Sequence, residues 1–445
     1  MNQTDQPATP IRRVVLASFI GTTIEWYDYF IFSVAAAFYF PKLFFPGLPE
    51  YAGIIASFTT YLVGFVARPL GGIIFGHLGD RIGRKTMLVT TLMMMGVATF
   101  LIGLLPTHHS IGAWAPILLV LLRFIQGFGV GGEWGGAVLM AVEHGHKGRR
   151  GYYASWAQAG VPMGLLLANG VFLVAQDKLT ETQLMDWGWR VPFLMGIALT
   201  GVGLYIRLNI MESPLFAKLQ ATAPERPAPI REVVRKHPRN ILLAMGTRFA
   251  ENATFYIFSG FMLVYAVKHL ELSRTVILNG IILAATVQLV TIPCFGALSD
   301  RVGRRPVYLF GAAFMALIAI PFFWLVDTQN PHLIWLALAL ALGVGHAAMY
   351  GPQAAFLSEM FSTRVRYSGV SLGYQLASPL AGGLAPIIAT ALLNKYGQPW
   401  LIAQYVIVVS LITMVSVYLA TETFQSDISR DDADTSPASE GDRNQ

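Results

Sequence analysis

The stretch GHLGDRIGRK, residues 76–85, lies directly between two long apolar runs. A second stretch of the same kind, GALSDRVGRR at residues 296–305, lies between two further apolar runs, 220 positions later. Glycines permit close backbone approach, and Arg and Lys cannot enter hydrocarbon cheaply. Each stretch therefore predicts a tight charged elbow that joins two antiparallel membrane helices. Two copies at matching positions indicate an internally duplicated membrane protein, an architecture associated with transport.

The composition excludes an ordinary soluble protein. Of the 445 residues, 54% are hydrophobic and only 13% are charged, whereas soluble domains carry roughly 25% charged residues. The net charge is +6, but the basic residues lie in short loops rather than in one patch, so we expect no nucleic-acid partner. The single cysteine excludes an intrachain disulfide. We also expect no cleavable signal, because the first apolar run contains Glu25 and Asp28.

Twelve apolar stretches are long enough to cross a bilayer, six on each side of a polar stretch. We expect an all-α membrane protein with two pseudo-symmetric six-helix bundles, residues 14–208 and 240–420. A cytoplasmic N-terminus (1–13), a cytoplasmic linker (209–239) and a disordered acidic tail (421–445) complete the chain. The expected spans are 14–40, 52–78, 86–105, 115–141, 152–176, 190–208, 240–267, 276–298, 306–326, 333–357, 368–393 and 399–420.

The distribution of Lys and Arg predicts the orientation of these spans. If the N-terminus is cytoplasmic, nineteen Lys and Arg residues lie in inner segments and six in outer loops. Such an excess is typical of cytoplasmic loops. A second inner loop also repeats, since residues 143–150 match 359–366 at an offset of 216. We therefore expect a multi-pass protein of the cell inner membrane with both termini in the cytoplasm.

Several motifs resemble those of a known transporter family. The two elbows resemble the signature loops of the major facilitator superfamily, and RFIQG at 123–127 resembles its fourth-helix motif. Narrower features resemble the metabolite:proton symporters, a family that includes shikimate, α-ketoglutarate, citrate and proline/betaine carriers. These features are EWYD at 25–28, RPLG at 68–71, GGEWGG at 131–136, WGWRVP at 187–192 and ESPLF at 212–216. The resemblance implies the twelve-helix major facilitator fold. The second elbow has Ser299 where the first has Gly79, which is a minor departure.

The resemblance also implies that the elbow charges lock helices near a cytoplasmic gate. A carboxylate near a helix end can in addition meet the positive N-terminus of a helix across the interface. Glu133 either belongs to this gate or holds Arg68. The gate and conformational candidates are Gly76, Asp80, Arg81, Arg84, Asp300, Arg301, Arg304, Glu133, Arg68, Glu143 and Glu359.

Charges inside the membrane cost several kcal/mol unless they are paired or hydrated, so each is a functional candidate. Asp28 lies about 22 Å along the first helix, and Arg123 about 13 Å into the fourth. Arg123 is thus deep enough to reach Asp28 or Glu25. A carboxylate that loses its arginine partner can take a proton. We expect proton coupling through Asp28, Glu25 and Arg123; the alternative is a permanent structural ion pair.

The seventh helix carries the candidates for substrate binding. Arg248 and Glu251 share one helix face, where they either line a cavity, with Arg248 as an anion clamp, or neutralise each other. His346 is either a satisfied hydrogen-bonding residue or a proton carrier. The aromatic residues within 26–29 either line the cavity or face lipid. The substrate-binding candidates are Arg248, Glu251, Gln158, Tyr374, Gln375, Gln353, His346 and Tyr29.

The sequence predicts a transporter rather than an enzyme, with no cofactor and no metal site. It contains no phosphate-binding loop and no Cys/His cluster with metal-ligand spacing. We expect a monomer in lipid that imports a small organic acid, such as shikimate or a di- or tricarboxylate, together with protons. The alternative substrate is a zwitterionic osmolyte such as proline or betaine. An intramembrane enzyme would need a nucleophile–base set that the spans lack, and a receptor would tolerate Asp28→Asn.

Overall fold

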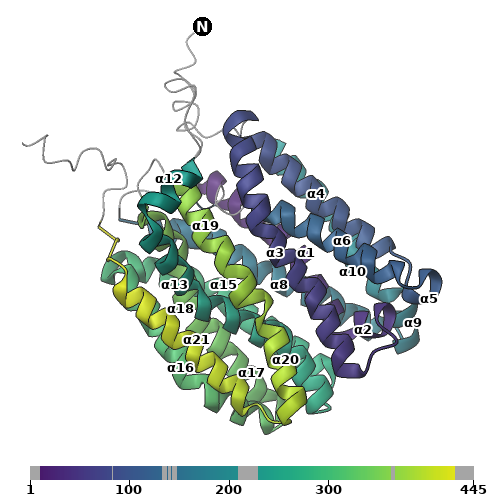
Figure 1. Cartoon of the computed structure of the whole chain (residues 1–445). Helices are drawn as coiled ribbons and strands as arrows, with labels where there is room; N and C mark the ends of the chain where they lie inside the picture. Colours follow the sequence, from purple (N-terminus) through teal and green to yellow (C-terminus); the bar gives the residue numbers. More distant parts are fainter. Residues whose placement is uncertain are drawn as a thin grey trace, which may run out of the picture.

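Helices make up the regular structure throughout the residues that the computed structural model describes. These residues are 11–82, 84–132, 138, 142, 148–208, 229–361 and 366–425. Figure 1 shows two groups of long helices, coloured purple to teal for the first half of the chain and teal to yellow for the second. The predicted all-α fold with two bundles is thus confirmed.

In the described part of the first half, each expected span overlaps a long helix. Short helices connect some of these spans at the end opposite to the elbows. The elements are α1 (Ile11–Phe38), α2 (Phe40–Phe44), α3 (Glu50–Ile82), α4 (Arg84–Leu104), α5 (His108–Ile111), α6 (Trp114–Gly131), α8 (Arg150–Lys178), α9 (Glu181–Asp186), η1 (Gly188–Arg190) and α10 (Val191–Leu208).

Three long helices of the second half contain wider, π-helical turns, which often occur at functional sites. The π-helical segments are η2 (Ile257–Phe261), η3 (Tyr265–His269), η4 (Ala341–His346) and η5 (Pro379–Gly383). The α-helices are α12 (Pro229–Lys236), α13 (Pro238–Tyr256), α14 (Met262–Val264), α15 (Arg274–Val302), α16 (Arg304–Asp327), α17 (Pro331–Leu340), α18 (Ala347–Glu359), α19 (Arg366–Ser378), α20 (Ala385–Tyr396) and α21 (Trp400–Leu419).

Long apolar helices with exposed apolar side chains indicate a membrane environment. Within the described ranges, nine helices are long and apolar enough to cross a membrane. Large side chains such as Val290 and Leu317 are exposed on them, which is favourable in hydrocarbon. The remaining expected spans correspond to α1, α4 and the run from α13 to η3. Of these, α1 contains Glu25 and Asp28, and both carboxylates are buried inside the bundle.

The two halves pack against each other along two seams. Helix α8 of the first half contacts α15 and α18 of the second, and α3 contacts α19, η5 and α20. A Cβ atom added to Gly151 would lie 2.5 Å from the carbonyl oxygen of Gly296, and one added to Gly296 would lie 2.5 Å from Ser155 Oγ. Glycine at both positions therefore lets α8 and α15 approach closely.

The chain after α21 remains in contact with the second bundle. Glu422 accepts hydrogen bonds from the backbone N–H groups of Arg304 at 2.9 Å and Arg305 at 3.0 Å. These are first-turn N–H groups of α16, which have no partner within the helix. The sequence predicted a disordered tail from residue 421; within residues 421–425, however, Glu422 caps α16 and Thr423 donates to Glu359. Linker residues 209–228 lie outside the described part of the chain.

Candidate functional site

Arg248 and Glu251 of α13 form a buried ion pair within the second half. Arg248 Nη1 lies 2.9 Å from Glu251 Oε2, and both side chains are almost fully inaccessible. The two residues are one helical turn apart, so a guanidinium and a carboxylate on one face can meet directly. Of the two alternatives left by the sequence, the structure therefore has the mutually neutralising pair.

Neighbouring helices hold this ion pair in place. Gln353 of α18 accepts from Arg248 Nη1 at 2.9 Å and donates to Glu251 Oε2 at 3.0 Å. Arg248 Nη2 donates to Ser378 Oγ at 3.4 Å. The guanidinium carbon also lies 3.4 Å from the ring centroid of Tyr374 in α19. The predicted lining residues of the second half thus come together from three helices.

His346 in η4 connects Glu251 to a second amide. Its Nε2 lies 3.3 Å from Glu251 Oε1, and its Nδ1 lies 2.8 Å from Gln288 Nε2 of α15. Gln288 Nε2 also donates to the carbonyl of Leu342 at 3.0 Å. If the Gln288 amide N–H donates to Nδ1, the Nε2 atom that faces Glu251 carries a ring proton. His346 is therefore a hydrogen-bonded residue in this arrangement, which is one of the two predicted alternatives.

Arg123 of α6 and Asp28 of α1 are linked indirectly. The sequence expected Arg123 to reach a carboxylate of the first helix, but the described residues contain no ion pair of Arg123. Instead, Arg123 Nη1 donates to Gln126 Oε1, and Gln126 Nε2 donates to Thr99 Oγ1 at 2.6 Å. Thr99 adjoins Asp28. The physical reason is that the guanidinium stacks on aromatic rings, which holds it away from the carboxylate.

Two buried guanidinium groups contact the ring of Tyr29. The guanidinium carbon of Arg123 lies 4.0 Å from the ring centroid, and that of Arg68 in α3 lies 4.4 Å from it. Arg68 also stacks on Phe65 at 4.7 Å and on Trp26 at 5.5 Å. Trp26 and Tyr29 therefore face the interior rather than lipid. Arg68 is about 21 Å from the end of α3, so it lies deep in the bundle rather than at the elbow.

The other predicted lining residues of the interior are also buried. Gln375 of α19 donates to the carbonyl of Gly131 at 3.3 Å across the interface between the halves. Tyr27 donates to the carbonyl of Pro192 at 2.8 Å. Gln158 lies buried in α8, and Glu25 lies buried within electrostatic reach of Arg68. The candidates thus come from both halves and lie inside the bundle.

Asp300 of the second elbow caps a helix of the other half. Its Oδ1 accepts from the backbone N–H of Gly151 at 2.8 Å, and its Oδ2 accepts from that of Tyr152 at 2.9 Å. These groups belong to the first turn of α8, which carries the positive end of the helix dipole. The carboxylate therefore ties the two halves together, in the kind of contact that the sequence suggested for elbow carboxylates.

Arg304 extends this contact to Glu359 of α18. Its Nη1 donates to Asp300 Oδ1 at 2.7 Å, while Nε and Nη2 each donate to one oxygen of Glu359 at 3.1 Å. Thr423 Oγ1 donates to Glu359 at 2.8 Å, and Arg150 Nη1 lies 3.8 Å from it. We call Asp300, Arg304, Glu359 and the first turn of α8 the elbow lock.

The remaining gate candidates are Arg301, which the structure describes, and six residues whose side chains it does not describe. Arg301 is exposed and forms no ion pair with any described residue. It therefore takes no part in the contacts of the elbow lock among the described residues, and its role at the gate stays a prediction. The side chains of Gly76, Asp80, Arg81 and Arg84, together with Glu133 and Glu143, lie outside the described residues.

Two ion pairs that the sequence analysis missed bridge the halves at the opposite end. Lys268 in η3 pairs with Glu50 at the start of α3. Arg274, at the start of α15, donates from two nitrogens to both oxygens of Glu181 in α9, each at 2.9 Å. The partners are 218 and 93 positions apart. The sequence analysis counted Lys268 and Arg274 among the basic residues of the expected outer loops, but it predicted no partner for either.

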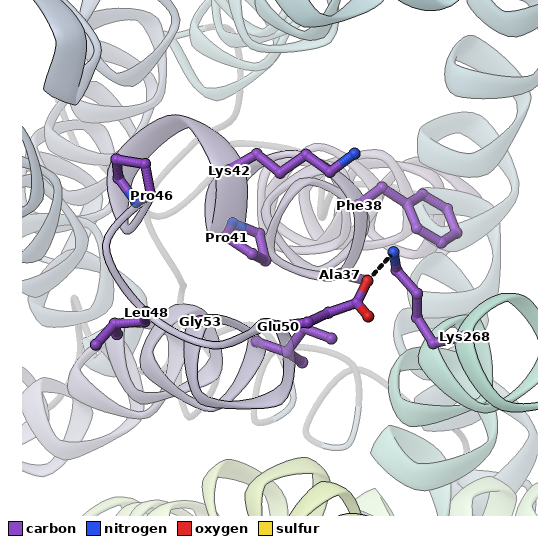
Figure 2. Close-up of a pocket in the computed structure, with 10 residues that line it drawn as sticks. Ala37, Phe38, Pro41, Lys42, Pro46, Leu48, Glu50, Gly53 and Lys268 are labelled. Atoms are coloured by element: carbon purple, nitrogen blue, oxygen red, sulfur yellow. Dashed lines mark hydrogen bonds and ion pairs between the residues drawn. The ribbon is translucent and has the colours of Figure 1, made fainter.

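A pocket of about 300 Å³ lies beside the first of these pairs. Figure 2 shows the amine of Lys268 directed at Glu50, with Lys42 and Phe38 lining the same pocket. The ion pair crosses from one half to the other, so it holds this end of the interface together. With the elbow lock at the other end, contacts between the halves occur at both ends of the polar interior.

We expect Glu181→Gln to make the two halves separate slightly more often at the end of the interface that carries this pocket. An exposed bidentate pair contributes up to about 1 kcal/mol, which corresponds to roughly fivefold in an opening equilibrium. Thiol labelling of Ile54→Cys, a buried pocket residue, in a background lacking Cys294 measures this opening.

A matched control is Asp177→Asn, which breaks an exposed pair with Lys178 inside one half. It should leave the labelling rate unchanged, and the swap Glu181→Arg with Arg274→Glu should restore it. Equal rates for Glu181→Gln and Asp177→Asn would show that the pair does not hold the halves together.

This geometry suits the passage of a polar solute. The interior offers charged and hydrogen-bonding side chains from both halves, and either end can open when its own contacts break. Within the described ranges, no group of three His, Cys, Asp or Glu side chains could hold a metal ion.

Comparison with known proteins agrees with this arrangement. The family model described as Major Facilitator Superfamily matches residues 18–373. The shikimate transporter of Escherichia coli (strain K12) is 41% identical over 415 residues, which cover 93% of this chain and 95% of that protein. The proline/betaine transporter of the same strain is 34% identical over 425 residues, covering 93% and 84%. A solved structure of a proton:xylose symporter superimposes with a TM-score of 0.72 at 16% identity, covering 93% and 98%.

The low identity to the solved structure means that it shows the fold alone. An inner membrane metabolite transport protein of Escherichia coli (strain K12) is 39% identical over 427 residues, covering 94% and 97%. This chain is accordingly a multi-pass inner-membrane transporter of a small molecule and not an enzyme. From the repeated elbows, the two bundles and these relatives, the chain belongs to the Major Facilitator Superfamily and, within it, to the metabolite:proton symporters.

Proposed function

We propose that this chain is a proton-coupled symporter that imports a small organic anion, such as shikimate or a di- or tricarboxylate, by alternating access. Both termini are cytoplasmic in this proposal, so the elbow lock faces the cytoplasm and the pocket of Figure 2 faces outward. The excess of Lys and Arg in the inner segments supports that orientation. The relative that is 41% identical and named a shikimate transporter supports the substrate class.

The charge balance of the buried interior carries the proposal. Away from the elbow end, the buried described residues include three arginines and three carboxylates, whose charges sum to zero when all are ionised. One added proton leaves a positive charge, which is costly inside a membrane unless an anion enters with it. A proton and an anion are therefore favoured to move together. The six residues are Arg68, Arg123, Arg248, Glu25, Asp28 and Glu251.

In this proposal the proton is carried by the first helix and the substrate lies between the halves. Asp28, with Glu25, exchanges the proton, and Arg123 responds through Gln126 and Thr99. One oxygen of Asp28 has no hydrogen-bond partner among the described residues, so it can accept a proton. The residues proposed to line the substrate space are Arg248, Glu251, Gln158, Tyr374, Gln375, Gln353, His346 and Tyr29.

A zwitterionic osmolyte such as proline or betaine is the alternative substrate, and the relative at 34% identity carries such a name. Quaternary ammonium groups bind to open faces of aromatic rings. Here Arg68 and Arg123 already stack on the buried rings, Arg68 on Trp26 and both on Tyr29. This occupation favours an anion over betaine.

Uptake into proteoliposomes tests the proposal. With an acidic exterior, we expect accumulation of an organic acid from a panel of shikimate, citrate and α-ketoglutarate, because inward proton flow drives it. A protonophore should abolish that accumulation. Accumulation of proline or betaine in place of an organic acid would contradict the proposal, and so would uptake that does not depend on the pH gradient.

A further inference from the structure

We propose that Arg68, together with the hydroxyl groups of Tyr29, Tyr61 and Tyr256, binds the carboxylate of the substrate. The inference rests on the proposed function, because it assigns the anion-binding part of that transport site. It differs from the sequence-based expectation, which gave the carboxylate to Arg248.

Six buried atoms around the Tyr29 ring have no hydrogen bond of normal geometry in the described part of the chain, although the Tyr29 hydroxyl lies close to the side chains of Arg123 and Tyr61. They are Arg68 Nε, Arg123 Nε and Nη2, and the hydroxyl oxygens of Tyr29, Tyr61 and Tyr256. Each of these side chains is at most 2% exposed. Buried polar groups are nearly always hydrogen-bonded in native proteins, because leaving them unpaired is unfavourable. A cluster of unpaired groups therefore indicates a ligand.

These groups form one compact cluster. The ring centroid of Tyr29 lies 4.6 Å from that of Tyr61 and 6.3 Å from that of Tyr256, and the latter two are 5.9 Å apart. The Arg68 guanidinium lies 4.4 Å from the Tyr29 ring. A carboxylate has two oxygens that can each accept more than one hydrogen bond. A ligand of that size can be reached by several of these groups at once.

The unpaired groups define the chemical class of the ligand, because they can all donate. An arginine N–H can only donate, and a phenol hydroxyl can do so. Asn252 Nδ2 and Trp26 Nε1, which are also buried and unpaired, add two further N–H donors, with Asn252 one turn before Tyr256. A carboxylate accepts from guanidinium through two parallel hydrogen bonds. The ammonium group of a zwitterion would gain little here, because phenol oxygens are the only acceptors among these unpaired atoms.

Arg248 lacks this capacity in the same arrangement. Its guanidinium already contacts Glu251, Gln353 and Ser378. Arg68, in contrast, forms no ion pair with a described carboxylate. A substrate carboxylate can therefore bind Arg68 without displacing a carboxylate of the described residues, whereas at Arg248 it would have to replace Glu251.

The proposed site spans both halves of the molecule. Arg68 and Tyr61 belong to α3 and Tyr29 to α1, while Tyr256 is the last residue of α13 in the second half. A carboxylate held by Arg68 and Tyr256 therefore connects the two halves. Its binding favours the arrangement seen here, because this arrangement brings donors of both halves to one anion.

Binding measurements on purified full-length protein test the assignment. The probes are shikimate, citrate and α-ketoglutarate, and the readout is calorimetric affinity with the melting temperature of the empty protein. Tyr256→Phe removes only an unpaired hydroxyl, so the empty protein should melt no lower, while affinity should fall about tenfold. Arg68→Gln should lose a hundredfold or more, and Arg68→Lys about tenfold, because lysine keeps the charge without the planar fork.

Arg190→Gln is the matched control, because Arg190 donates to the carbonyl of Leu105 at the end of the first bundle that lies away from the elbow. Its affinity should equal that of the unmodified protein. Suppose that the unmodified protein binds an organic acid and that the Tyr256→Phe and Arg68→Lys variants bind it equally well. The assignment is then overturned, while the proposed function stands. If the unmodified protein binds none of the three acids, both fail. The phenylalanine variant decides the matter even if Arg68→Gln does not fold.

Discussion

Replacing Asp28 with asparagine is expected to abolish uphill accumulation of the anion while leaving anion exchange intact. Asparagine keeps the size of the side chain and its polarity next to Thr99, but it cannot take up or release a proton. It also fixes the interior in the charge state that Asp28 has when protonated, in which an anion is favoured. The exchange of external for internal substrate requires no net movement of protons, so this reaction should continue.

Two measurements on the same proteoliposomes separate these effects. Accumulation under an inward proton gradient should fall until the internal and external concentrations are equal. Exchange of labelled for unlabelled anion should remain close to that of the unmodified protein. Asp177→Asn, which removes an exposed carboxylate of the same half, should change neither. If Asp28→Asn and Glu25→Gln both kept full gradient-driven accumulation, coupling through the first helix would be wrong.

Replacing Arg304 with alanine is expected to have the largest effect on stability and to open the elbow end. The substitution removes the guanidinium that bonds both Asp300 and Glu359. Among the described residues, Asp300 then keeps only its backbone N–H partners, and the only cation left beside Glu359 is the more distant Arg150, at 3.8 Å. Breaking a buried ion pair in this way costs about 3–5 kcal/mol. Because the lock exists only when α8 lies against α15, part of that loss falls on the closed arrangement alone. Thermal denaturation in detergent measures the loss of stability.

A thiol reporter measures the opening itself. Ser155 is fully buried against Gly296 at the seam between α8 and α15, so Ser155→Cys should react only when the elbow end opens. The exposed Cys294 must first be replaced. Arg305→Ala is the control, since Arg305 donates to carbonyls of α21 within its own half. Labelling should speed up in Arg304→Ala alone, and equal rates in the two variants would exclude the lock as the closing element.

The elbow lock was predictable because its signal is local and duplicated. In both halves, charged residues follow a glycine at the end of an apolar run. Because such charges avoid hydrocarbon, the sequence places them at helix ends. The same reasoning gave helix positions to within a few residues: the span expected at 276–298 is α15, Arg274–Val302. It could not tell that Arg301 is exposed while Arg304 is buried, because this depends on how α15 and α16 are each rotated about their axes.

The Arg68 cluster was not predictable in the same way, because its members come from α1, α3 and α13. One signal was available, since Tyr61, Phe65 and Arg68 are spaced by four and three residues and thus share a face of α3. The sequence could not place Tyr29 and Tyr256 against that face, because helix packing decides which faces meet. The pairs of Lys268 and Arg274 at the end opposite to the elbows were missed for a related reason: exposed loop charges carry no information about distant partners.

The contact between Glu422 and the start of α16 makes the C-terminal end of the last helix a mechanical part of the gate. The two backbone N–H groups that Glu422 accepts from belong to Arg304 and Arg305, so the residue that closes the elbow end is itself anchored from beyond α21. We expect a protein shortened before residue 422, or one with a purification tag fused there, to lose this anchor of α16 and to open its elbow end more readily, although every transmembrane segment is untouched. Affinity tags for transport assays are better attached after residue 425.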